Sequence, residues 1–243
     1  MDYSFLQCGE GALTVHLGDG IDPAINRRVT ALQGAIGSAG LRGITDLIPA
    51  YADLTVCYDC TVISAKALQR QLRRLLDSLS VAGQDRRRVF RLPVCYGGDY
   101  GPDLDFVCHH SGLSAQEVIE LHSAPDYLIY MLGFLPGFAY LGGLDPRLHT
   151  PRLDSPRTCI PAGSVGIGGA QTGVYPLASP GGWQLLGRTP VSVFDRQRQE
   201  PILYRAGNLV HFVPISPAEY EEIARAVAAG THTVQVEEVP VCD

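Results

Sequence analysis

Residues 160–189 bring together the groups that a small polar ligand would need. Glycine lets a ligand approach the main chain closely, although tight turns between strands need glycine as well. The polar and aromatic residues among the glycines favour binding, and Trp183 is the only tryptophan of the chain. The segment contains Gly163, Gly166, Gly168, Gly169, Gly173, Gly181 and Gly182, interspersed with Ser164, Gln171, Thr172, Tyr175, Trp183 and Arg188. We therefore predict a ligand-binding surface here.

A second stretch, residues 130–143, is apolar and aromatic and is interrupted by Pro136 and glycines. Such a run forms either a core hairpin or the wall of a pocket or interface. We expect it to converge with residues 161–175 and Arg188 on one concave surface, because an amide-carboxylate ligand needs an amide partner, an apolar wall and a cation. Arg188 or Arg152 would supply the cation. The predicted substrate-binding residues are Tyr130, Phe134, Gly163, Ser164, Gln171, Tyr175 and Arg188.

Three known catalytic or nucleotide-binding patterns do not fit the sequence. A dinucleotide fingerprint would need a glycine where Gln171 stands and a helix after it. Ser164 lies in a sequence close to a nucleophile elbow, but no helical period follows this serine. Lys66, the only lysine, has no glycine-rich loop before it, so the chain has no Walker A loop. These patterns argue against dinucleotide binding and serine hydrolysis.

The ionisable residues give one candidate for proton transfer. His122 ends a predicted helix beside the expected cleft, and the ordinary pKa of histidine lies close to neutral pH. Cys57 and Cys60 form a single CxxC pair, so buried or incidental cysteines are favoured over a metal or redox site. Cys108, His109 and His110 could bind a metal, but they end another helix, where interaction of the histidines with the helix dipole is favoured. We predict no metal site and no structural disulfide in this chain.

Composition excludes several classes of function. The formal net charge is -6, so the chain lacks the basic excess of a nucleic-acid-binding protein. No apolar run approaches the ~18 residues that span a bilayer, and the N-terminus has no signal-peptide pattern. Irregularly spaced cysteines without a disulfide pattern fit a reducing compartment, and we expect a cytoplasmic protein that does not bind membranes. Charged residues make up 18%, which favours a buried interface with a partner, although a compact monomer explains this fraction nearly as well.

The first third of the sequence alternates short strands with two amphipathic helices. Asp22 and Pro23 open one helix, and Ser64 caps another whose apolar face is made of leucines. The polar stretch at 83–88 is predicted to be a solvated linker between two domains. The predicted fold class is α+β, with a small N-terminal α+β sandwich of the split β-α-β type at 1–86, followed by a second domain at 87–243.

The second part of the chain has a different pattern of residues. Two capping boxes, Ser114 with Glu117 and Ser216 with Glu219, predict the starts of helices. Between them, residues 126–213 are rich in glycine and proline and show no convincing helical period. The short β-type runs in this region are 127–131, 191–194 and 209–213. This pattern predicts a β-barrel or sandwich with long loops.

Six ordered motifs resemble those of one known family. They are Pro93–Gly98, Gly101–Leu104, Gly133–Gly142, Pro161–Gly166, Gln171–Pro176 and Pro180–Trp183. Together they are similar to the family of bacterial 5-oxoprolinase B subunits, which is also labelled allophanate hydrolase subunit 1 and sporulation-kinase inhibitor. The similarity covers residues 40–215 and has one local departure at 168–171, where the family tends to read Ala-Gly-Gly-Gln.

The resemblance carries expectations for fold and partners. It implies a small N-terminal α+β domain and a C-terminal cyclophilin-like β-barrel. It also implies a stable complex with the C subunit of 5-oxoprolinase, which has a related barrel architecture, and a third protein, the A subunit. Such a complex opens the lactam of 5-oxo-L-proline to L-glutamate and uses ATP with Mg, so we expect this chain to be inactive alone.

The predicted function is thus that of one component of an ATP-dependent 5-oxoprolinase. Phosphorylating the lactam oxygen would activate the ring carbon, and a glycine-rich loop could hold a phosphoryl group through backbone N–H donors. Two alternatives stay open: a regulatory protein that inhibits a histidine kinase, and a component of an amidohydrolase that acts on allophanate. A lactam and allophanate both present an amide beside a carboxylate, so the pocket residues do not separate these substrates.

Overall fold

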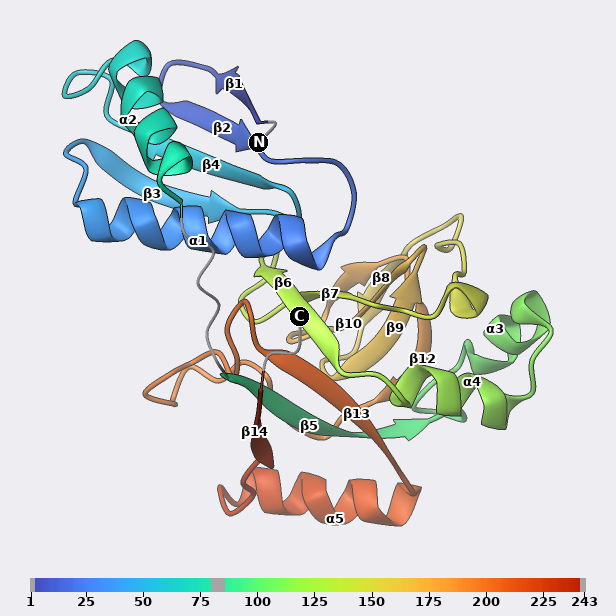
Figure 1. Cartoon of the computed structure of the whole chain (residues 1–243). Helices are drawn as coiled ribbons and strands as arrows, with labels where there is room; N and C mark the ends of the chain where they lie inside the picture. The colour runs from blue at the N-terminus through green and yellow to red at the C-terminus, as the bar shows by residue number, and fades with distance from the viewer. Residues whose placement is uncertain (1–2, 80–85, 241–243) are drawn as a thin grey trace. The chain divides into compact units, whose positions relative to one another are not determined.

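The structure is a computed structural model and describes residues 3–79 and 86–240. The chain forms two compact units, residues 1–85 and residues 86–243 (Figure 1). Both units combine helices with strands, which confirms the predicted α+β class. Within the described ranges, no helix is long and apolar enough to cross a membrane.

The N-terminal unit is one sheet with two helices. Its elements are β1 (Ser4–Cys8), β2 (Ala12–His16), α1 (Pro23–Ala39), β3 (Ile44–Pro49), β4 (Asp53–Tyr58) and α2 (Ala65–Asp77). The strand order is β1-β2-β4-β3, and every neighbouring pair is antiparallel. β2 and β3 therefore run parallel on either side of β4 and are connected through α1, which is the predicted split β-α-β arrangement.

Both helices of this unit begin at the predicted caps. The Asp22 carboxylate accepts a hydrogen bond from the Ala24 amide at 2.6 Å, and Pro23 occupies the first turn of α1. Ser64 caps α2 by accepting a hydrogen bond from the Ala67 amide. These contacts satisfy amide groups that have no partner inside a helix. The helices and the sheet share one core, which includes Leu13, Val15, Val29, Leu32, Ile36, Leu54, Val56, Leu68, Leu72 and Leu76.

The second unit is a closed β-barrel. Its strands are β5 (Arg86–Tyr96), β6 (Tyr127–Leu132), β7 (Ala139–Gly142), β9 (Ser164–Gly168), β10 (Gln171–Val174), β12 (Gln184–Arg188) and β13 (Leu209–Ile215). They pair in the order β12-β9-β10-β7-β6-β13-β5, and pairing of β12 with β5 closes the ring. β5 and β13 are parallel, while the other pairs are antiparallel. The closed ring confirms the expected barrel, and closure leaves these strands without exposed edges.

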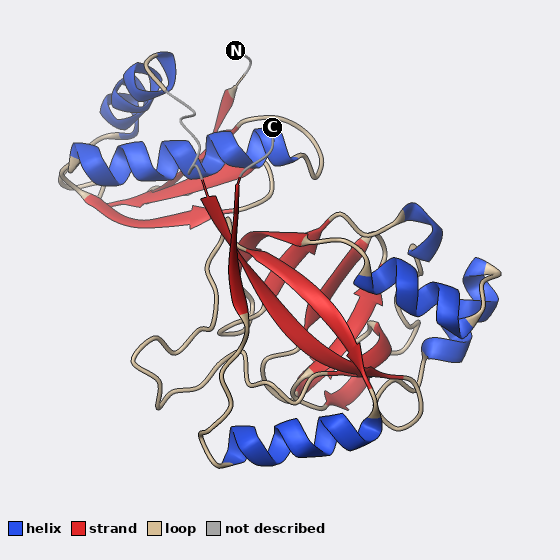
Figure 2. Cartoon of the chain, turned by 60° about the horizontal axis from the view of Figure 1, so that its bottom comes forward, coloured by secondary structure: helices blue, strands red, loops and turns tan. Residues whose placement is uncertain are grey.

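The remaining elements lie around the barrel (Figure 2). They are α3 (Leu104–Ser111), α4 (Ala115–Ser123), α5 (Pro217–Ala228), β8 (Arg157–Ile160), β11 (Ser179–Gly181), β14 (Val236–Pro240) and a 3-10 turn at Pro146–Leu148. α3 packs beside β12, α4 beside β13 and α5 beside β5. Both predicted capping boxes are present, because Ser114 and Ser216 each exchange hydrogen bonds with the glutamate three residues later.

The arginines at 86–88 do not lie in a solvated linker, and that expectation is wrong for these residues. They begin β5 and pair with β14. The Arg86 guanidinium lies 3.7 Å from the Glu238 carboxylate, so an acidic strand balances the basic run. The sequence signal was misleading because the acidic partner lies far along the chain. Residues 83–85 of the expected linker lie outside the described residues.

The run 191–194 is not a strand, which corrects a second expectation. It makes an isolated bridge between Phe194 and Ile202 instead of a ladder. Val191 and Val193 are nevertheless buried in the barrel core. Alternating burial produced the strand-like pattern here, although no neighbouring strand supplies a continuous set of hydrogen bonds.

His122, the first candidate for proton transfer, lies in the barrel core and is fully buried. Its Nε2 lies 2.8 Å from Thr172 Oγ1, and its Nδ1 lies 2.8 Å from the Tyr96 hydroxyl. The Thr172 hydroxyl donates to the Gly166 carbonyl at 3.0 Å and therefore accepts from Nε2–H. Nδ1 then accepts from Tyr96. The imidazole also stacks on Phe212, with ring centroids 4.8 Å apart.

This environment keeps the imidazole neutral. Burial lowers the pKa of His122 to about 3, because an apolar core disfavours the charged form. Both ring nitrogens already have partners inside the barrel. Proton transfer to a ligand would require these neighbours to move, and a catalytic role of His122 stays a prediction.

The pKa of His122 should make the fold sensitive to acid. An unfolded histidine has a pKa of about 6.5, so the unfolded chain binds one more proton than the folded chain between that pH and about 3. The stability that the folded chain gains from burying His122 in its neutral form is fully present above this window and is lost as the pH falls through it. We expect His122→Gln, which keeps a donor and an acceptor, to reduce the pH slope of the unfolding free energy by about 1.4 kcal/mol per pH unit in the window. Urea unfolding of the wild-type protein and of His122→Gln between about pH 4 and 6 measures the pH slope of the unfolding free energy. Equal slopes for the two proteins would contradict the expectation.

Candidate functional site

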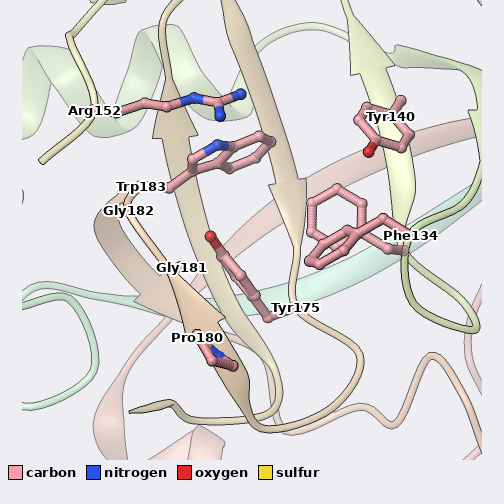
Figure 3. Close-up of a pocket in the computed structure, with 9 residues that line it drawn as sticks. Phe134, Tyr140, Arg152, Tyr175, Pro180, Gly181, Gly182 and Trp183 are labelled. Carbon is pink, nitrogen blue, oxygen red and sulfur yellow. The ribbon is translucent and has the colours of Figure 1, made fainter. Parts of the chain in front are cut away.

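A cavity of about 330 Å³ lies beside Tyr175 and Trp183 (Figure 3). The Trp183 ring in turn lies against Gly168 of β9 and Gly173 of β10. Val165 and Ile167 of β9 point into the barrel core, so the glycines between and beside them face outward. The cavity is lined by Phe134, Phe138, Tyr140, Arg152, Tyr175, Pro180, Gly181, Gly182 and Trp183. These residues come from the β6–β7 hairpin, the loop before β8, the position directly after β10, and the segment from β11 to β12. The hairpin and Tyr175 of the predicted 161–175 segment therefore line one hollow, but Arg188, which was expected to join them, does not line it.

The cavity walls are aromatic rings packed edge to face. Phe138 is the centre of the cluster and is almost fully buried. Its ring centroid lies 5.6 Å from those of Tyr175 and Trp183 and 5.3 Å from that of Tyr140. Interplanar angles between 63° and 81° place ring edges against ring faces, an arrangement that aromatic quadrupoles favour. This packing builds a stiff apolar wall before any ligand arrives.

Glycine is required where the Trp183 indole lies on the barrel. A Cβ atom on Gly168 would collide with the indole Nε1 and Cδ1 atoms, and one on Gly173 would lie 3.2 Å from the far edge of the ring. Both positions belong to the outer face of the paired strands β9 and β10. The glycines thus form a flat floor for the tryptophan. Part of the glycine signal in the sequence is explained by this packing and not by direct ligand contact.

Arg152 supplies a cation at the rim of the cavity. Its guanidinium carbon lies 5.9 Å from the centroid of the Trp183 ring (Figure 3). Hydrogen bonds on both sides hold the segment in place: the Leu153 amide donates to the Gly182 carbonyl at 2.7 Å, and the Gln184 side chain donates to the Pro151 carbonyl at 3.1 Å. The cation and the indole are therefore fixed to each other through the main chain.

Phe134 is the exposed member of the aromatic set. It is 63% exposed, and its φ of 48° lies in the left-handed region that non-glycine residues seldom adopt. The ring lies 4.9 Å from Phe138 and also borders a second, apolar hollow of about 350 Å³ formed by residues 132–137 and Ile202. Such strain at a cavity edge occurs often at functional sites.

The cavity offers hydrogen-bond donors and one charge. Burial raises the pKa of the Tyr175 phenol, so this group stays protonated at neutral pH and can donate or accept. The described residues that line the cavity include no His, Cys, Asp, Glu, Ser or Lys side chain. The lining can therefore bind a small anionic molecule, but apart from the tyrosine phenols its described residues bring no base or nucleophile to the bound molecule.

Phe134 and Tyr175 are the predicted substrate-binding residues that line this cavity. Tyr130 is buried in β6, and Gln171 begins β10. The list of predicted substrate-binding residues omits Phe138, Tyr140 and Pro180–Trp183, although the aromatic run contains the first two and Trp183 was named among the groups suited to a small polar ligand. Their selection would have required knowing which faces of the strands point outward.

Arg188, Gly163 and Ser164 group together at the other end of β12. Trp183 and Arg188 are five positions apart in the sequence, which corresponds to about 16 Å along an extended strand. The Arg188 guanidinium lies over the Tyr100 ring at 5.9 Å, and Gly163 lines a separate hollow of about 190 Å³. Ser164 Oγ and Arg188 Nε are buried without a hydrogen-bond partner among the described residues. A substrate role for these three residues stays a prediction, and it concerns a different place from the aromatic cavity.

The glycine-rich segment does not fit the expected phosphoryl cradle. Its amide groups already donate within the barrel: Gly163 to the Tyr175 carbonyl at 2.7 Å, Ser164 to Pro161 at 3.3 Å, and Gly169 to Thr150 at 2.8 Å. A cradle needs neighbouring amides that point at the ligand. Among the described residues there is also no cluster of three or more potential metal ligands, and the cysteines described are free.

Comparison with known proteins assigns the chain to a family. Residues 3–204 match the family described as carboxyltransferase domain, subdomain C and D. The B subunit of 5-oxoprolinase from Bacillus subtilis is 42% identical over 90% of this chain and 95% of that protein. The B subunit of 5-oxoprolinase from Escherichia coli O157:H7 is 45% identical over 85% and 93%, respectively. A putative urea carboxylase of Emericella nidulans is 26% identical over 97% of this chain and 22% of that protein.

Solved structures agree on the fold. The crystal structure of TTHA0988 matches with a TM-score of 0.74 and 40% identity, over 84% of this chain and 40% of that chain. The K. lactis urea amidolyase matches with a TM-score of 0.82 and 23% identity, over 98% of this chain and 16% of that chain, which is a likeness of fold. This chain thus spans less than half the length of both solved chains. It belongs, on sequence and fold together, to the family of 5-oxoprolinase B subunits.

Proposed function

We propose that this chain is the substrate-binding part of an ATP-dependent 5-oxoprolinase and that the aromatic cavity holds 5-oxo-L-proline. The observation that carries the proposal is the combination of stiff aromatic walls with Arg152 in one small hollow. Relatives of similar length that are named as 5-oxoprolinase B subunits support the reaction. The complex would open the lactam to L-glutamate.

The cavity chemistry matches this ligand. 5-Oxo-L-proline has a nearly flat lactam ring with an apolar edge of methylene groups, and it carries one carboxylate. The methylene edge of the ring suits the faces of Phe138 and Trp183, because removing apolar surface from water is favourable in free energy. The carboxylate suits the guanidinium of Arg152, which offers paired donors in a plane. Tyr175 lies on the same wall and can donate to the lactam oxygen or accept from its N–H.

The proposal assigns bond breaking to the complex and not to this chain alone. Apart from tyrosine phenols, the described residues of the cavity lining include no base or nucleophile. The amides of Gly163, Ser164 and Gly169, in the segment that was expected to hold a phosphoryl group, donate within the barrel, so these amides do not fit an ATP site. We therefore place ATP and Mg on the partners, the A and C subunits of 5-oxoprolinase. The longer solved relatives, in which this fold is only part of the chain, are consistent with such neighbours.

The first test separates Arg152 from Arg188. Arg152→Gln should weaken binding of 5-oxo-L-proline about tenfold, because a charge-assisted contact is lost at an exposed rim. Quenching or enhancement of Trp183 fluorescence during titration measures binding, since no other tryptophan is present. Arg188→Gln is the matched variant at the other end of β12. If Arg188→Gln weakens the binding of 5-oxo-L-proline and Arg152→Gln binds it normally, the ligand site lies at Arg188 and not in the aromatic cavity.

The second test concerns the partners. The purified chain should bind 5-oxo-L-proline but release no glutamate with ATP and Mg, whereas the chain reconstituted with the A and C subunits should do so. Glutamate release by the separated and combined proteins is measured with an enzyme-coupled assay. Robust turnover by this chain alone would show that it carries its own base and nucleotide site, and the assignment of roles would be wrong.

Urea-pathway chemistry is the second candidate function, since a relative named putative urea carboxylase matches most of this chain. Allophanate, which also presents an amide beside a carboxylate, is the second candidate ligand. Allophanate is polar along its whole length, so burying it against the aromatic rings would leave amide groups without partners. We therefore expect 5-oxo-L-proline to compete strongly for the cavity and allophanate to compete weakly. Stronger competition by allophanate in the Trp183 titration would reverse the substrate assignment.

A further inference from the structure

The turn at Gly101–Leu104 contacts β12, the strand that follows Trp183. The Asp103 carboxylate accepts a hydrogen bond from the Leu185 amide at 2.6 Å through Oδ2. The Asp103 amide donates to the Leu185 carbonyl at 3.0 Å. A Cβ atom on Gly101 would collide with the Leu186 carbonyl, so only glycine allows the turn to approach β12 this closely.

Arg157 completes this contact from β8. Its Nη2 donates to Asp103 Oδ1 at 2.7 Å, and its Nη1 donates to the Trp183 carbonyl at 3.3 Å. The Asp103 side chain is 12% exposed and that of Arg157 is 30% exposed. Each carboxylate oxygen of Asp103 therefore has its own donor, and the guanidinium bridges the carboxylate to the main chain at Trp183.

These contacts bracket the residue that forms the aromatic wall. Arg157 fixes the carbonyl of Trp183, and Asp103 fixes both backbone groups of Leu185. Rotation of the main chain between these two points is thereby restricted, and the direction of the Trp183 side chain follows from the main chain. The planar fork of arginine serves two acceptors at once, which the ammonium of lysine does less well.

We propose that Asp103 and Arg157 are positioning residues that hold Trp183 in its place as a wall of the ligand cavity. Neither residue lines the cavity. Their effect on the ligand passes through the main chain of residues 183–185. The effect on ligand binding rests on the proposed function, whereas the effect on the Trp183 environment does not.

The experiment uses the full chain, alone and in the reconstituted complex. Asp103→Asn removes the charge, and Arg157→Lys keeps the charge but loses the fork. The control is Arg147→Gln, which breaks an exposed arginine–aspartate pair with Asp145 at 2.7 Å, in the same unit. Emission and acrylamide quenching of Trp183 report its environment in every variant, and circular dichroism reports the fold.

We expect both variants of the Asp103–Arg157 pair to shift Trp183 emission to longer wavelength and to raise its quenching by about twofold, with the control unchanged. In the complex, KM for 5-oxo-L-proline should rise roughly tenfold while kcat changes less than about twofold. If Asp103→Asn fails to fold, Arg157→Lys decides. Unchanged Trp183 emission and quenching in folded Arg157→Lys would overturn the proposal, even if activity fell. A changed Trp183 signal in the variants, together with no binding of 5-oxo-L-proline to the wild-type protein, would support the positioning role and refute the proposed ligand.

Discussion

The packing of one indole ring on two glycines organises the candidate site. Trp183 can lie flat on the barrel because Gly168 and Gly173 present no side chain on the outer face of β9 and β10. The same ring forms an edge-to-face cluster with Phe138 and Tyr175 and lies beside Arg152. A methyl group at Gly168 would lift the indole from the barrel. The position of the aromatic wall, and of Arg152 beside it, therefore depends on the contact between the indole and these two glycines.

This arrangement explains how a barrel with a filled interior offers a binding site. The interior is occupied by aliphatic and aromatic side chains together with His122, whose neutral ring is held by Tyr96 and Thr172. No room for a substrate is needed there, because the ligand surface is built on the outside of the wall. Stiff rings on a closed barrel form a preorganised site, so ordering the site on ligand binding costs little free energy.

Local sequence signals predicted the fold well, and the site only in part. Helix caps such as Asp22 and Ser114 act over a few residues, so the sequence contains the whole interaction. Arg188 and Tyr175 are close in sequence, but β12 carries Arg188 away from the indole that precedes it. Arg152, the alternative cation, is placed beside the indole by long-range hydrogen bonds between residues 151–153 and 182–184. Strand direction and long-range pairing decide such questions, and neither is encoded locally.

The two kinds of glycine in the 160–189 segment show why composition alone could not settle its role. Gly163, with a φ of 80°, makes a turn, and Gly168 and Gly173 make a surface on which another side chain lies. Neither use requires a ligand to touch glycine. The glycines act on the ligand indirectly, by allowing Trp183 and its neighbours to approach the barrel. A glycine-rich segment can thus indicate a binding site indirectly, because its glycines make room for a large residue such as Trp183. That residue, and not the glycines, is then expected to contact the ligand.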